Sequence, residues 1–98
     1  MNEEFRVRLL LALQVTLLGN IGKNIRAVSC DAIEENIRVR VIFDGKIANE
    51  DKEAIEDVGS ELASHFEKEL VDTQCIQIDA PQSFRNDCLA LLVYQRRE

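Results

Sequence analysis

The longest amphipathic pattern of the chain covers residues 49–71. At about 100° per residue, its apolar side chains fall on one half of a helix and a row of acids falls on the other. The pattern predicts a helix with Asn49 as its N-cap residue. Gly59 and Ala63 lie on the apolar half, and we interpret them as small residues that let the helix approach a sheet closely.

A second helix is predicted over residues 3–18, where Gly19 ends the pattern. Unusually, this helix is apolar on two sides. One stripe consists of Phe5, Leu9, Ala12, Leu13 and Leu17. A second stripe, on roughly the opposite side, consists of Val7, Leu11, Val15 and Leu18. A helix that is apolar all round is usually buried on several sides. Two alternatives remain for what covers the second stripe. Either the 49–71 helix and a loop cover it, or another chain does.

The remaining apolar runs predict strands. The clearest alternation places Arg38 and Arg40 between apolar residues, which is typical of a sheet with one buried and one wet face. We expect both arginines to face solvent or a partner. The predicted strands are residues 25–32, 37–43, 73–79 and 88–94. The chain is therefore predicted to be a single α+β domain over residues 1–98. Its expected order is α-β-β-α-β-β, with a mostly antiparallel four-stranded sheet and two helices on one face.

Charge narrows the choice of partners. The net charge is −6, and residues 50–72 hold nine acids and two lysines. This balance opposes binding to nucleic acid or an anionic membrane, and long-range steering would attract a basic protein. Two explanations for the acids of the 49–71 helix stay open, solubility and recognition of a basic partner. The candidate binding residues are Glu50, Glu53, Glu56, Asp57, Glu61 and Glu67.

Cysteine usage and the N-terminus predict a cytoplasmic protein. Cys30, Cys75 and Cys88 are widely spaced and odd in number, which favours reduced, buried, structural thiols over disulfides or a zinc site. An apolar run after Arg8 imitates a secretory signal. However, acids precede it, no small-residue cleavage site follows it, and it is too short to span a membrane.

Catalytic chemistry has little support in the sequence. His65 is the only histidine, so we predict no metal site, no cofactor and no enzymatic activity. Glu61 lies one helical turn before His65 and could share a proton with it. This pair is the one enzymatic alternative, and it requires a buried pocket beside His65.

The segment FDGKIANEDKEAIEDV, preceded by NIRAVSCDAIEENIRVRVI and followed by IQIDAPQ and LLVYQRRE, carries a family resemblance. In pattern and element order it resembles small bacterial toxin-immunity proteins of contact-dependent inhibition and related polymorphic toxin systems. The resemblance implies a cytoplasmic protein that blocks one cognate toxin, often a basic nuclease, by covering its active site. The acidic helical face would then be the contact surface. The alternative is a self-associating module that forms a homodimer through the second stripe.

Overall fold

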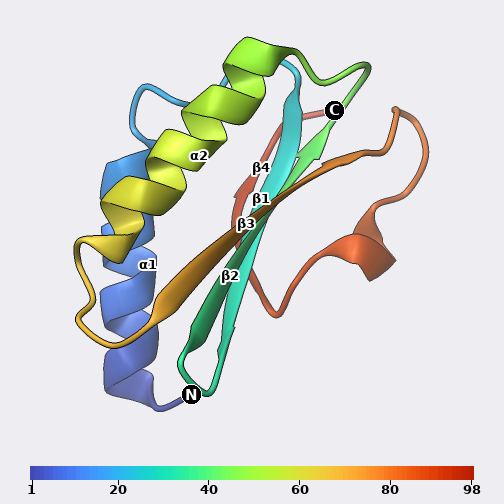
Figure 1. The fold of residues 1–98 in the computed structure, drawn as a ribbon. Coiled ribbons are helices and arrows are strands. Elements are labelled where there is room, and N and C mark those ends of the chain that lie inside the picture. Colours follow the sequence, from blue (N-terminus) through green and yellow to red (C-terminus); the bar gives the residue numbers. More distant parts are fainter.

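The computed structural model describes residues 1–98 and shows two helices on one face of a four-stranded sheet (Figure 1). The elements are α1 (Glu3–Leu17), β1 (Ile25–Ile33), β2 (Asn36–Phe43), α2 (Asn49–Ala63), β3 (Leu70–Gln77), the short 3₁₀-helix η1 (Arg85–Asp87) and β4 (Leu91–Gln95). The predicted α+β class and the α-β-β-α-β-β order are confirmed.

The sheet has the strand order β3-β2-β1-β4. As predicted, it is mostly antiparallel, because β1 pairs in this way with both β2 and β4. The pairing of β2 with β3 is parallel, and α2 supplies the crossover that parallel neighbours need. Since β3 and β4 are the two edge strands, residues 78–90 must pass from one edge to the other. They do so on the face that the helices leave open (Figure 1).

The predicted end of the second helix is wrong. The helix α2 ends at Ala63, and the chain then turns into β3, which begins at Leu70. Leu70 and Val71 fit the apolar half of a helical wheel, but in the structure they pair with β2, and the Leu70 amide donates to the Glu35 carbonyl at 2.8 Å. Hydrogen bonds to a strand distant in sequence therefore override the local helical pattern.

Other boundaries shift by smaller amounts. The N-cap residue of α2 is Ala48 and not Asn49, and no side chain caps this end. The helix α1 ends one residue before its predicted end. The third strand runs from 70 to 77 instead of 73 to 79, and the last from 91 to 95 instead of 88 to 94. Leu89 lies outside this strand, and its amide donates a hydrogen bond to the hydroxyl of Ser29 instead of to a strand neighbour.

The main core lies between the helices and the sheet. The first stripe of α1 supplies Leu9 and Leu13, which are fully buried against strand residues such as Val39. Val58 and Leu62 of α2 complete the same cluster. The alternation predicted for β2 is confirmed, because its buried positions Ile37, Val39, Val41 and Phe43 all belong to this core.

Gly59 is a point of close approach between α2 and the sheet. A Cβ atom at this position would lie 2.7 Å from the Cγ2 methyl of Thr73 on β3. Ordinary contacts between carbon atoms are about 3.5–4.0 Å. The interpretation of Gly59 as a packing glycine is therefore confirmed.

Gly59→Ala is expected to destabilise the fold by about 1 kcal/mol. The overlap with Thr73 should cost about 1–3 kcal/mol, because a β-branched side chain has little freedom to move aside. The better helix propensity of alanine offsets at most about 1 kcal/mol of this loss in stability. Urea unfolding measures the difference. Adding Thr73→Ser, which removes the methyl group, should recover most of the loss, and a Gly59→Ala protein more stable than the wild type would refute the packing role.

Candidate functional site

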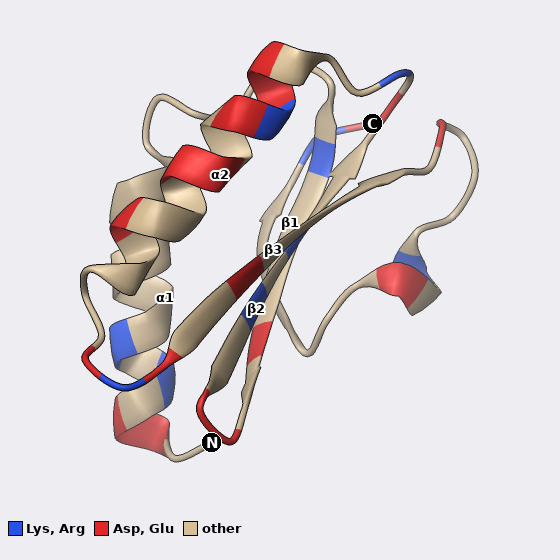
Figure 2. Cartoon of the chain, in the orientation of Figure 1, with Lys and Arg blue, Asp and Glu red and all other residues tan.

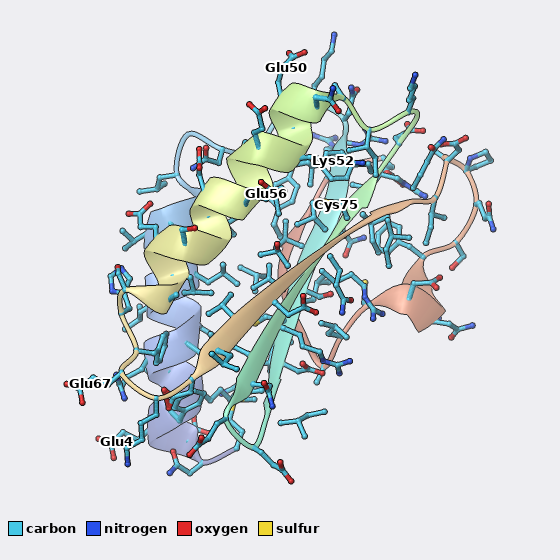
Figure 3. All side chains as sticks on the ribbon, viewed as in Figure 1. Glu4, Glu50, Lys52, Glu56, Glu67 and Cys75 are labelled. Carbon is cyan, nitrogen blue, oxygen red and sulfur yellow. The ribbon has the colours of Figure 1, made fainter.

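Five of the six candidate acids form a row on the solvent side of α2. Figure 2 colours the positions of the acidic residues along this helix red, and Figure 3 shows the side chains of Glu50 and Glu56 projecting from it. Every member of the row is exposed, and none takes part in any ion pair of the structure. The acidic row, as we call it from here, consists of Glu50, Glu53, Glu56, Asp57 and Glu61.

The acidic row spans the width of the helix. Since Val58 and Leu62 mark the buried side, Glu53 and Asp57 lie near the outermost line of α2. Glu56 lies on the flank toward β3, beside Cys75 (Figure 3). Burial raises the pKa of the Cys75 thiol, and the Glu56 charge adds to this rise in pKa.

No ion pair relieves the repulsion within the row, although the helix dipole favours Glu50 in the first turn and Lys52 lies one helical turn before Glu56. Glu53, Asp57 and Glu61 follow one another at intervals of four residues. Like charges at this spacing destabilise a helix by about 0.2–0.5 kcal/mol per pair. Lys52 is the only cation on α2, and it forms no ion pair. The row therefore weakens the isolated helix slightly and leaves its charge available to another molecule.

Glu67 does not belong to the row, because α2 ends before it. It is exposed in the turn that follows α2, and Figure 3 shows it near Glu4, at the N-terminal end of α1. This turn is held against α1 by Phe66. The Phe66 ring centroid lies 5.4 Å from that of Phe5 and 5.1 Å from the guanidinium carbon of Arg8. Glu67 is thus a separate surface charge.

His65 lies in the same turn and is exposed. Its carbonyl accepts a weak hydrogen bond from Arg8 at 3.4 Å, while no hydrogen bond joins its ring to Glu61. Two hollows of about 370 and 310 Å³ border this histidine, but both are open to solvent, so the buried pocket that the enzymatic alternative requires is not present there. Elsewhere, no three His, Cys, Asp or Glu side chains are arranged to hold a metal ion.

The second stripe of α1 is not covered by the chain. Leu11 is 58% exposed, Leu18 is 77% exposed, and Val7 and Val15 are also exposed. The covering by α2 and a loop, one of the two predicted options, is wrong. The helix α2 packs beside α1 on the sheet and not over it, so the second stripe points away from the core (Figure 1).

The sequence reading missed the cluster on the opposite face of the sheet. Arg26 of β1 is only 2% exposed. Its Nε and Nη2 donate to the Glu98 carboxylate at 2.7 and 2.8 Å, and its Nη1 donates to the Ile78 and Gln82 carbonyls, both at 2.8 Å. The guanidinium carbon lies 4.7 Å from the ring centroid of Phe84. Hydrogen bonds from Arg26 first, and then from Arg96, lower the pKa of Glu98 to about 2.

Arg38 and Arg40 lie on this face, but the prediction that they face solvent or a partner is wrong, because both are half-buried and bound within the chain. Arg38 forms a bidentate pair with Asp31. Arg40 donates to the Gln74 side chain at 2.9 Å and to the Asp87 carbonyl at 2.8 Å. Arg38 therefore links β2 to β1, whereas Arg40 links β2 to β3 and to the 78–90 segment.

All three cysteines are free thiols, but the prediction that all of them are buried holds only for Cys30, because Cys75 and Cys88 are half-buried. Cys30 is buried in the main core, and this burial raises its pKa to about 12. Neither α1 nor α2 combines the length and the apolar character needed to cross a bilayer.

Taken together, these features define a small α+β protein with an unpaired acidic helical face. A family model matches residues 6–98, and the chain belongs to the MafI2 immunity protein family. No curated protein matches it. The prediction of a toxin-immunity protein is confirmed at this level, and membership implies that the chain binds a cognate toxin protein. Its placement among contact-dependent inhibition systems stays a prediction.

Proposed function

We propose that the chain neutralises a basic toxin domain by docking the acidic row of α2 onto it. The observation that carries the proposal is that this row is exposed and unpaired within the chain. The surplus of acids is also concentrated there. Outside α2 the chain has twelve acids against eleven lysines and arginines. Solubility requires no such concentration on one helix, whereas recognition of a basic surface does.

The chemistry of the row favours a nuclease-type toxin. A protein that cuts nucleic acid needs lysine and arginine side chains around its active site to hold phosphates. Carboxylates on a rigid helix can pair with these cations and thereby cover the site. Opposite charges also steer the two proteins together and raise the association rate constant. The chain would act in the cytoplasm of the producing cell, where the nucleic acid at risk lies.

Carboxylate footprinting tests the proposal without altering the protein. The probe is the cognate toxin domain, in a catalytically inactive form. Glu53 and Asp57 should react readily with a carbodiimide and an amine in the free protein, and should be protected in the complex. Glu34 and Glu35, exposed in the β1–β2 hairpin, provide an internal control and should react equally in both states. Equal labelling of Glu53 and Asp57 in both states would refute docking through the row.

A further inference from the structure

The exposed stripe of α1 adjoins the acidic row. A groove of about 310 Å³ joins α1 to the turn after α2, and its lining consists of Arg8, Leu11, Ala12, Val15, His65 and Phe66. Glu61 precedes this turn in the last helical turn of α2. The apolar stripe and the acidic row are therefore neighbouring parts of the surface.

The two parts also face the same way. On α1, the buried residues Leu9 and Leu13 lie on the side opposite to Leu11. On α2, Glu53 and Asp57 lie opposite the buried residues. Because both helices pack on the same face of the sheet, their outward sides belong to one side of the molecule (Figure 1).

We propose that the second stripe of α1 is the apolar core of the toxin-binding surface, with the acidic row as its charged rim; this inference rests on the proposed function. The partner it fits is a toxin domain that presents an apolar side chain beside its lysines and arginines. Charged contacts alone mainly set association rates and specificity. Tight interfaces also bury an apolar centre, and they cover about 800 Å² on each partner, which is more than one helical row offers.

Charge also favours a toxin over a second copy of the chain as the occupant. Two-fold pairing through the stripe would bring the acidic rows of both copies next to the contact, where like charges repel. An antiparallel pairing of α1 would set Glu3 and Glu4 beside the last turn of the other copy. That turn has no basic residue that could form an ion pair with Glu3 or Glu4. A basic toxin meets neither obstacle.

Leu11→Gln tests the inference, and Ile33→Gln provides a matched control. Leu11 and Ile33 are both 58% exposed, but Ile33 belongs to β1, outside the helical layer. Both changes are neutral in charge, and glutamine is a good helix former. With the cognate toxin domain, Leu11→Gln should raise the dissociation rate constant about tenfold or more. Ile33→Gln should leave it unchanged, and Val15→Gln should repeat the Leu11 result.

The outcomes separate this inference from the proposed function. If Leu11→Gln and Val15→Gln dissociate like the wild type, the apolar core is refuted, while protection of Glu53 and Asp57 would still support the acidic row. If Leu11→Gln dissociates faster but neither acid is protected, the shared surface and the proposed docking are both refuted. If light scattering shows a wild-type dimer that Leu11→Gln converts to a monomer, the occupant is a second copy and the inference is wrong.

Discussion

Arg26→Ala is expected to lower the free energy of unfolding by about 3 kcal/mol. The substitution removes the partner of a hydrogen-bonded ion pair and leaves the carbonyls of Ile78 and Gln82 without their donor. Breaking one side of a buried pair typically costs about 3–5 kcal/mol. We expect the lower end because the Glu98 side chain is about one-third exposed and can regain water. Urea unfolding followed by circular dichroism gives the difference directly.

Glu98→Gln is the control for this change. It keeps Arg26 in place with its two carbonyl acceptors and its stacking on Phe84, so its effect should be less than half that of Arg26→Ala. Both variants should still bind toxin while folded, because this cluster lies on the sheet face opposite the helices. A loss for Arg26→Ala no larger than that of a typical surface substitution, about 0.5 kcal/mol, would show that Arg26 does not hold the 78–90 segment.

The local spacing of apolar and polar residues was sufficient to predict most of the helices and strands. The alternation in β2 and the buried stripe of α1 each identify one face of an element, and the structure buries those faces. The end of α2 could not be predicted in this way, because Leu70 and Val71 satisfy both a helical and a strand pattern. Whether these two residues form helix or strand depends on hydrogen bonds to β2, which is more than 25 residues earlier in the chain.

The exposure of the acids in the candidate site was also predictable from the local spacing of residues. Acids on the polar half of α2 are exposed because the opposite half is buried, and Glu67 was misplaced only because the helix ends earlier. The role of Arg26 was not predictable. Its one sequence signal is a charge inside an otherwise apolar strand, and its partners lie 52 to 72 residues away along the chain. Nor could the sequence decide whether the second stripe is covered, since this depends on how α2 packs.

Glu53→Lys combined with Asp57→Lys should slow toxin association about 10- to 100-fold at low ionic strength. The double reversal places positive charge on the outermost line of the acidic row, where a basic toxin would approach. Electrostatic steering typically raises association rates by about 10- to 1,000-fold, and it weakens steeply as salt is added. The fold should be unaffected, because both side chains are exposed and unpaired. The difference from the wild type should shrink at high salt.

The most direct test of docking through α2 is a comparison of two double variants with the same change in net charge. Stopped-flow mixing with the cognate toxin domain gives their association rate constants at low ionic strength. Glu53→Lys with Asp57→Lys should be slow. Glu34→Lys with Glu35→Lys, which reverses two exposed acids in the β1–β2 hairpin, should stay within about twofold of the wild type. If both variants are slowed equally, or neither is slowed, the acidic row of α2 is not the toxin-binding site.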